Sequence, residues 1–298
     1  MELILIQAVV LAQAVIMFSL GIGLEIADFK RVFERPYAFS IALVCQLLIL
    51  PALAFATVTF FSFPPVLAAG LMILSFCPGG VTSNIISKVS QGDVALSVSL
   101  TAVVSIISFI TVPPLIAWAI TYFMAEDAIE FSFYQLALIT FLITTTPVSI
   151  GVFVRHNWAE LAKKIEPILE KIALALWVII VSAAIAKSFD KLLENFQLIG
   201  SGLMALPLAM AFIGVFVSYI FGLSIKESKT ISIESSIQNS PMAITLATAI
   251  TGASTEIPDL ALPAAVYSVT MYLVAIPFVL IFRRWNEESG RKELATNN

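Results

Sequence analysis

The feature that most constrains this chain is a series of long apolar runs separated by short charged stretches. A helix of about 20 apolar residues is long enough to cross a bilayer. A membrane β-barrel would instead need short segments of alternating polarity, and none is present. The sequence therefore predicts an all-α polytopic membrane protein with nine transmembrane helices. The predicted spans are 3–24, 36–60, 66–91, 93–123, 133–155, 168–187, 200–222, 226–252 and 260–283.

Composition supports this class and excludes others. The chain is 59% hydrophobic and 12% charged, whereas soluble domains carry roughly 25% charged residues. No basic patch is interleaved with aromatic residues, so nucleic-acid binding is not expected. The lone histidine, His156, argues against a His-based metal site or catalytic triad. We expect the lipid bilayer as a partner, no organic cofactor and no obligate protein partner.

The positive charges predict the orientation in the membrane. The first ten residues lack the positive region of a signal peptide, so the first run is expected to stay as a span. Of the sixteen Lys and Arg residues, fourteen fall on one set of alternate connections or ends, and only Lys187 and Lys191 fall on the other. We expect the protein in the cell (inner) membrane. Because cytoplasmic loops are enriched in Lys and Arg, the N-terminus is predicted outside and the C-terminus in the cytoplasm.

Two of the predicted spans are interrupted. The third contains CPGGVTSN at 77–84, and the eighth contains QNSP at 238–241. Proline and glycine do not continue an ordinary helix. Matching interruptions in two halves of a membrane chain indicate an inverted repeat, and such broken helices hold coupling ions in transporters.

Glu234 lies just before the second interruption, with no other acid until Glu256. An ionised group at membrane depth costs about 2.5–3.5 kcal/mol by insertion scales, so it normally faces a partner or a water-filled path. Oxygen-bearing side chains accompany both breaks and suit a hard cation. They are Ser83 and Asn84, the pair Ser97 and Thr101 four residues apart, Gln238 four residues after Glu234, and Gln46.

The segments 78–101 (PGGVTSNIISKVSQGDVALSVSLT) and 232–247 (SIESSIQNSPMAITLA) resemble the crossover regions of the bile acid:sodium symporters. The resemblance covers nearly the whole chain and corresponds to the nine-span form, which lacks the first helix of ten-span bacterial members. It implies two Na⁺ ions that share one glutamate. The first site would use Ser83, Asn84, Ser97, Thr101 and Glu234. The second would use Gln46, Glu234 and Gln238 with the backbone carbonyls of Ser235 and Ile237.

The resemblance also implies a substrate site and two moving parts within a single transporter unit, 1–298. Thr82, Asn239 and Ser240 would hydrogen-bond an anionic head beside the crossover. A core domain, 36–123 and 200–283, would move against a panel domain, 1–35 and 133–187. The implied function is Na⁺-coupled symport of an organic anion, either bile-salt-like or a small carboxylate such as pantothenate.

Other readings of these residues remain open. Glu234 would also suit a structural acid, and Gln46 and Gln238 would also suit bridges between helices. Ser97 and Thr101 would also suit bonds to their own helix carbonyls. On the same scaffold, the alternative function is a proton-coupled or uncoupled organic-anion or efflux carrier. An intramembrane enzyme would need a second deep catalytic group, so no enzymatic activity is expected, and one asymmetric pocket fits alternating access better than a channel.

Overall fold

The computed structural model describes residues 2–125, 129–187, 189–252 and 258–296. Within these residues all regular elements are helices, as expected, and one isolated backbone bridge joins Gly79 to Gln238. In chain order the elements are α1 (Glu2–Ile22), α2 (Ile26–Glu34), α3 (Pro36–Val44), η1 (Cys45–Ile49), α4 (Leu50–Phe60), α5 (Pro65–Phe76), α6 (Val81–Val89), α7 (Val94–Met124), α8 (Phe133–Thr140), η3 (Phe141–Thr145), α9 (Thr146–Asn157), α10 (Ala159–Lys187), α11 (Phe189–Ile220), α12 (Ile225–Ser236), α13 (Ser240–Thr251), η4 (Asp259–Ala261) and α14 (Leu262–Thr296).

The helices confirm a multi-pass membrane protein. In the described part of the chain, five helical segments are long and apolar enough to cross a bilayer, or up to six if the bent pair α1–α2 is one span. They are Pro36–Phe60, Val94–Met124, Phe133–Asn157, Ile199–Ile220 and Asp259–Trp285. Broken spans fall short of this length test, since α5 and α13 are apolar helices of only 12 residues each. The number nine stays a prediction.

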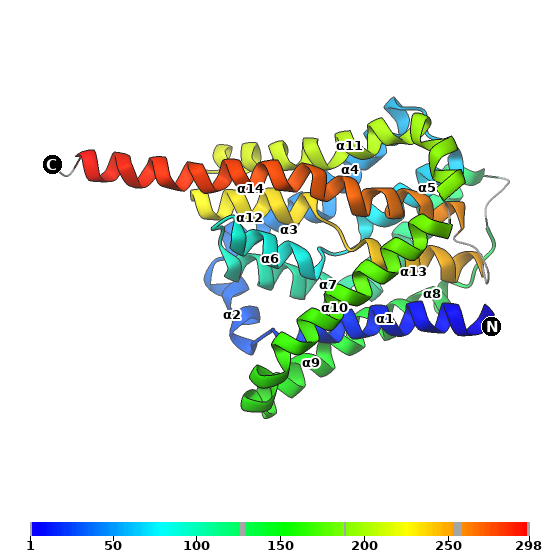
Figure 1. Ribbon diagram of the computed structural model, residues 1–298, viewed down its shortest axis with the longest axis horizontal. Coiled ribbons are helices and arrows are strands. Elements are labelled where there is room, and N and C mark those ends of the chain that lie inside the picture. Colours follow the sequence, from blue (N-terminus) through cyan, green and yellow to red (C-terminus); the bar gives the residue numbers. More distant parts are fainter. Residues whose placement is uncertain (1, 126–128, 188, 253–257, 297–298) are drawn as a thin grey trace.

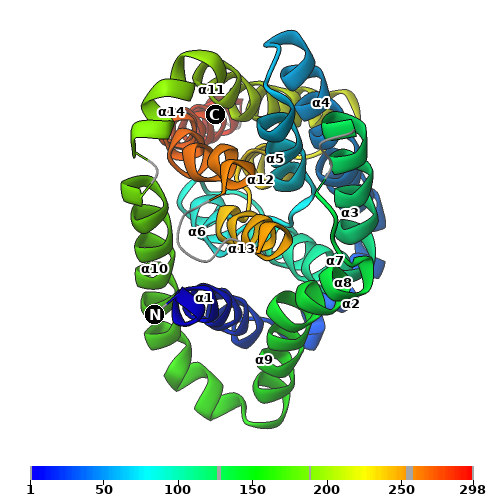
Figure 2. The ribbon, with the colours of Figure 1, turned by 90° about the vertical axis from the view of Figure 1, so that its right-hand side faces the viewer.

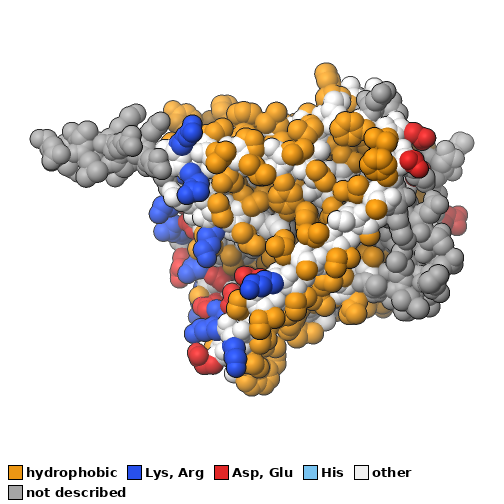
Figure 3. Space-filling view, in the orientation of Figure 1, with side chains coloured by type: hydrophobic (Ala, Val, Ile, Leu, Met, Phe, Trp, Pro, Cys, Tyr) orange, Lys and Arg blue, Asp and Glu red, His pale blue; other side chains and the backbone are white. Residues whose placement is uncertain are grey.

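Most of the helices lie roughly along one axis (Figure 1), and charged side chains gather toward the ends of that axis (Figure 3). Lys and Arg side chains gather at the end of the molecule where α2 and the later part of α14 lie, and hydrophobic side chains cover the face between the ends (Figure 3). We call this the cation-rich end. An apolar belt between two polar ends is the surface that a bilayer requires.

Two spans contain a wide helical turn where a proline follows. The π-helical segment η1 precedes Pro51, and η3 precedes Pro147. A proline ring has no N–H and clashes with the carbonyl four residues earlier, so the helix widens there without breaking. Gln46 lies in the first of these wide turns.

Two connections between predicted spans are helical. The segment 25–35, which lies outside the predicted spans, contains the helix α2, which turns by 68° from α1. Its start is capped because the backbone N–H of Glu25 donates to Asp28 at 2.8 Å. The stretch 158–167 also lies outside the predicted spans, and from Ala159 it is helical and continuous with the next span in α10 through Pro167.

The two interrupted spans repeat one order of elements. In each, a half-helix ends, a short extended segment follows, and a second half-helix starts: α5–α6 around Cys77–Gly80, and α12–α13 around Ile237–Asn239. A long helix containing a proline follows each pair, α7 and α14. The pairs run in opposite directions, since α6 and α12 lie toward the cation-rich end, and α5 and α13 toward the other (Figure 1).

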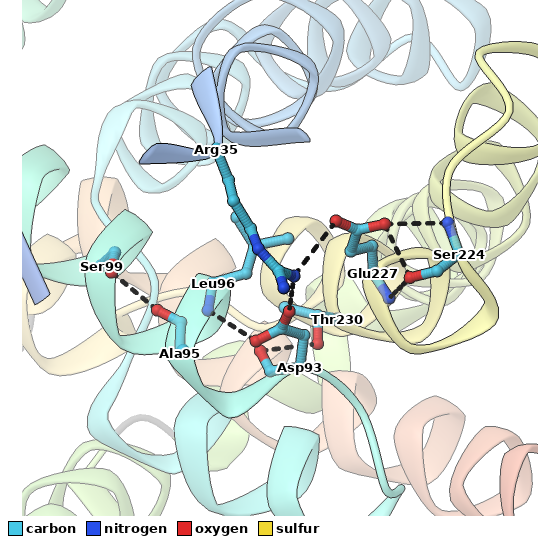
Figure 4. Close-up of polar contacts among 8 residues, drawn as sticks. All are labelled: Arg35, Asp93, Ala95, Leu96, Ser99, Ser224, Glu227 and Thr230. Carbon is cyan, nitrogen blue, oxygen red and sulfur yellow. Dashed lines mark hydrogen bonds and ion pairs between the residues drawn. The ribbon is translucent and has the colours of Figure 1, made fainter. Parts of the chain in front are cut away.

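A polar network joins the two halves near the cation-rich end (Figure 4). Arg35 contacts Asp93 at 3.4 Å and Glu227 at 3.9 Å. Asp93 caps α7 by accepting from Leu96 N, and Glu227 completes a capping box with Ser224 at the start of α12. Thr230 also donates to the Asp93 carbonyl at 3.1 Å. These contacts hold the first turns of α7 and α12 together.

Glycines allow α1 to pack closely on α9. A Cβ on Gly151 would lie 2.6 Å from the carbonyl carbon of Gly21 and 2.6 Å from the nitrogen of Ile22. Both atoms belong to the backbone of α1, so neither helix can adjust by a side-chain rotation. α10 also packs against α1, and the three helices stand together in Figure 2.

We expect Gly151→Ala to destabilise this helix pair. Overpacking a tight interface costs about 1–3 kcal/mol, so the melting temperature of the purified protein in detergent should fall clearly. Gly23→Ala is the matched control, because its Cβ would have only ordinary contacts, at 3.4 Å or more. An equal melting temperature for Gly151→Ala and the wild type would contradict the close packing.

Candidate functional site: the crossing of two broken helices

The two breaks touch each other directly. Gly79 and Gln238 form the antiparallel backbone bridge, and Asn239 N donates to Pro78 O at 3.0 Å. Backbone groups that leave a helix at membrane depth need partners from the protein, water or a ligand. Each break therefore supplies part of what the other lacks. The N-terminal ends of α6 and α13 and the C-terminal ends of α5 and α12 all meet here (Figure 1).

Glu234 is 1% exposed and lies in the last turn of α12, beside this crossing. Ser97 donates to its Oε1, and Thr101 donates to its Oε2 at 2.9 Å. Both hydroxyls come from one face of α7, because they are four residues apart. The predicted alternative, in which Ser97 and Thr101 bond to their own helix, is not what the structure has.

Asn84 and Ser83 complete this group from α6. Asn84 Oδ1 lies within 2.7 Å of Ser97 Oγ and 3.5 Å of Thr101 Oγ1, the same hydroxyls that bond Glu234. The Ser83 hydroxyl donates to Gly80 O at 2.7 Å, so it closes its own helical turn. A Cβ on Gly79 would lie 2.7 Å from Glu234 Oε2 and 3.3 Å from Ser83 Oγ. The five residues predicted for the first ion site thus lie together.

The residues predicted for the second site also meet. Gln46 Nε2 donates to Gln238 Oε1 at 2.8 Å and to Cys77 O at 3.2 Å. Gln238 Nε2 in turn donates to the carbonyl oxygens of Ser235 at 3.1 Å and Glu234 at 3.3 Å. Ile237 lies in the extended break itself, and its N–H bonds Ile233 O.

One atom of this second group lacks a partner. Gln46 Oε1 is buried and accepts no hydrogen bond from the described residues. A buried unsatisfied acceptor costs about 1–3 kcal/mol, so it normally marks a position that another group fills. The donor set here is amide and carbonyl oxygen, which suits a hard cation such as Na⁺.

The three predicted substrate residues have different surroundings. Thr82 and Asn239 line one cavity beside the crossing, and the Thr82 hydroxyl lies 2.7 Å from Tyr272 OH. Asn239 caps α13 by accepting from Met242 N at 3.1 Å. Ser240 is fully buried without a hydrogen-bond partner among the described residues and does not line that cavity.

The sequence interpretation missed the wall opposite the crossing. Glu170, Ala173, Leu174 and Trp177 of α10 line the same cavity, and Trp177 packs edge-on against Tyr272 at 5.2 Å. Their spacing at i, i+3, i+4 and i+7 marks one face of a helix, which was the available signal. A larger groove of about 1050 Å³, its open mouth included, shares Val81, Ile85 and Glu170 with this cavity. It also reaches Asn84 and Lys88.

The fold and the site together define a multi-pass helical membrane protein whose two discontinuous helices cross around a buried carboxylate. Discontinuous helices of this kind are typical of secondary transporters.

Comparison with known proteins agrees with this class. The model of the Sodium Bile acid symporter family matches residues 10–195, more than half of the chain. A probable sodium/metabolite cotransporter of Arabidopsis thaliana chloroplasts is 30% identical over 268 residues, which are 90% of this chain and 65% of that protein. The chain belongs to the Sodium Bile acid symporter family, a family of transporters and not of enzymes.

Two further relatives show the breadth of the family. The ileal sodium/bile acid cotransporter of Oryctolagus cuniculus is 27% identical over 83% of this chain and 70% of its own length. An uncharacterised sodium-dependent transporter of Bacillus subtilis is 27% identical over 86% of this chain and 76% of its own. The chain spans less than two thirds of the length of the Arabidopsis protein.

Two adjacent glycines allow a test of the Glu234 group. We expect Gly79→Ala to lower the melting temperature in sodium-free buffer, because the new Cβ would push Glu234 away from the hydroxyls that bond it. A hydrogen bond to a charged group contributes about 1.5–3 kcal/mol. Gly80→Ala is the control, since its Cβ would approach nothing closer than 3.5 Å. Equal melting temperatures for the two variants would show that the site is looser than described.

Proposed function

We propose that this protein is a secondary active transporter that carries an organic anion across the cell membrane together with Na⁺. The observation that supports this best is the buried carboxylate of Glu234, surrounded by hydroxyl and amide oxygens where two half-helices meet. The names of relatives in plants, animals and bacteria agree, since they describe sodium/metabolite, sodium/bile acid and sodium-dependent transporters.

In this proposal two Na⁺ ions are bound as cargo at the crossing. The first is held by Glu234 with Ser83, Asn84, Ser97 and Thr101. The second is held by Glu234 and Gln238, by Gln46 and by the carbonyls of Ser235 and Ile237. The unpartnered Gln46 Oε1 supports the second position. With a monovalent anion, two Na⁺ ions would move one net positive charge in each cycle.

The anion would bind in the cavity beside the crossing, near the N-terminal ends of α6 and α13. Free N–H groups and partial positive charge at helix N-termini favour a negative head group. Thr82, Asn239 and Ser240 are the residues proposed to contact it. The cargo class is an organic anion, bile-salt-like or a small carboxylate such as pantothenate.

Transport would proceed by movement of the core, 36–123 and 200–283, against the panel, 1–35 and 133–187. The described groove supports this division, since α1 and α10 line one side and α6 and α7 the other. Its lining includes Lys88 in the last turn of α6, the half-helix that lies toward the cation-rich end (Figure 1). With the N-terminus outside and the C-terminus in the cytoplasm, the groove would open to the cytoplasm.

Glu234→Gln tests the coupling. The variant keeps the shape but not the charge, and losing about 1.5–3 kcal/mol weakens sodium binding roughly 10–100-fold. In proteoliposomes, Na⁺-driven uptake of radiolabelled taurocholate or pantothenate should disappear while the protein still folds. Glu160→Gln is the control, because this glutamate side chain is 93% exposed. Full Na⁺-driven uptake by Glu234→Gln would refute the site, and uptake in choline buffer that follows pH would favour the proton-coupled alternative.

Gln46→Leu tests the second ion position separately. Sodium that binds the folded state raises the melting temperature. The Hill coefficient of that response cannot exceed the number of sodium sites. Wild-type protein should respond to NaCl with a Hill coefficient above one, and Gln46→Leu with a coefficient of about one. Gln135→Leu, at an exposed position of α8, should behave as wild type. An unchanged coefficient in Gln46→Leu would contradict the second site.

A further inference from the structure

Gln13 of α1 is a buried amide without a role in the site described so far. It is fully buried, and neither its Oε1 nor its Nε2 has a hydrogen-bond partner in the described part of the chain. Buried polar groups are nearly always hydrogen-bonded, so an amide with both ends unsatisfied requires an explanation. An apolar side chain at this position would lose no hydrogen bond, unless Gln13 bonds a ligand or bonds another group in a different state of the protein.

Its position connects it with the crossing. Gln13 and Met17 are one helical turn apart on the same face of α1. Met17 Sδ lies 3.7 Å from Asn239 Nδ2, at the start of α13. α1 contacts α13, and the two helices lie side by side in both ribbon views (Figures 1 and 2). Ile16, next to Met17, lines the cavity that also contains Asn239.

Neighbouring polar groups face sulfur in place of oxygen or nitrogen. The Thr144 hydroxyl of η3 is directed at Met242 Sδ at 3.6 Å. The Asn239 amide is directed at Met17, and Ser240 Oγ has no partner among the described residues. A thioether is only a weak acceptor. Where α1 and η3 pack on α13, the Asn239 amide nitrogen and the Thr144 hydroxyl therefore face methionine sulfur, which is a poor hydrogen-bond partner.

We infer that Gln13 lines the outer half of the cargo pathway and hydrogen-bonds the anion there when α13 moves away from α1. This rests on the proposed function. The described groove reaches the crossing from the cation-rich end, and Gln13 lies beyond it toward the N-terminal end of α1. Its N–H groups would donate to the carboxylate or sulfonate of the cargo, and its carbonyl would accept from a hydroxyl or amide N–H of the same molecule.

Cysteine labelling tests whether this interface opens. Gln13→Cys, in the chain that keeps the fully buried Cys45 and Cys77, should react with a membrane-impermeant sulfonated maleimide added from the N-terminal side in NaCl. Val148→Cys is the control, since Val148 is fully buried where α9 packs on Gly21 of α1 and should stay unlabelled. Absence of labelling at Gln13→Cys in both NaCl and choline chloride would overturn the inference.

Uptake by Gln13→Leu tests contact with the cargo. For whichever of taurocholate and pantothenate the wild type takes up, KM should rise roughly tenfold, as for one lost hydrogen bond of about 1.4 kcal/mol. The melting temperature without cargo should be unchanged or higher, because an unsatisfied amide has been removed. Gln135→Leu is the matched control and should keep the wild-type KM. A wild-type KM in Gln13→Leu, whatever its melting temperature, would indicate a structural amide and overturn the inference.

The two hypotheses fail differently. Wild-type protein without Na⁺-dependent uptake of either probe would refute the proposed function, whatever the labelling shows. Wild-type protein with such uptake, but with Gln13→Leu indistinguishable from it, would refute the role of Gln13 alone.

Discussion

The contact between two interrupted helices is the constraint on which the rest of this structure depends. A chain in a bilayer cannot leave backbone N–H and C=O groups without partners, yet both α5–α6 and α12–α13 stop being helical far from either end of the molecule. The bridge between Gly79 and Gln238 and the bond from Asn239 to Pro78 satisfy part of this need. Each break therefore depends in part on the other for its hydrogen-bond partners.

This crossing also explains why Glu234 can be buried. The carboxylate needs donors, and α7, which packs against α12, provides two hydroxyls on one face because Ser97 and Thr101 are four residues apart. Gly79 is important here for its missing side chain, since a Cβ would fill the space beside Glu234 Oε2. The break in the helix, the absent side chain of Gly79 and the buried carboxylate of Glu234 thus depend on one another.

The network of Arg35, Asp93 and Glu227 extends this coupling to the cation-rich end (Figure 4). It ties the first turns of α7 and α12, the helices that carry Ser97, Thr101 and Glu234. Because Arg35 is largely exposed, each ion pair by itself contributes little, about 0–1 kcal/mol. The helix caps made by the same two acids matter more, since a cap contributes about 0.5–2 kcal/mol.

The sequence by itself determined that this chain is a multi-pass helical membrane protein, because long apolar runs can satisfy their backbone in a bilayer only as helices. It also located both breaks, through Pro78 with its glycines and Pro241, and it singled out Glu234 by its isolation. Only the tertiary structure decided which groups meet. The unpaired Gln46 Oε1, the α10 wall and the covered Gln13 depend on helix rotation and on contacts between distant segments, which periodicity along one chain does not contain.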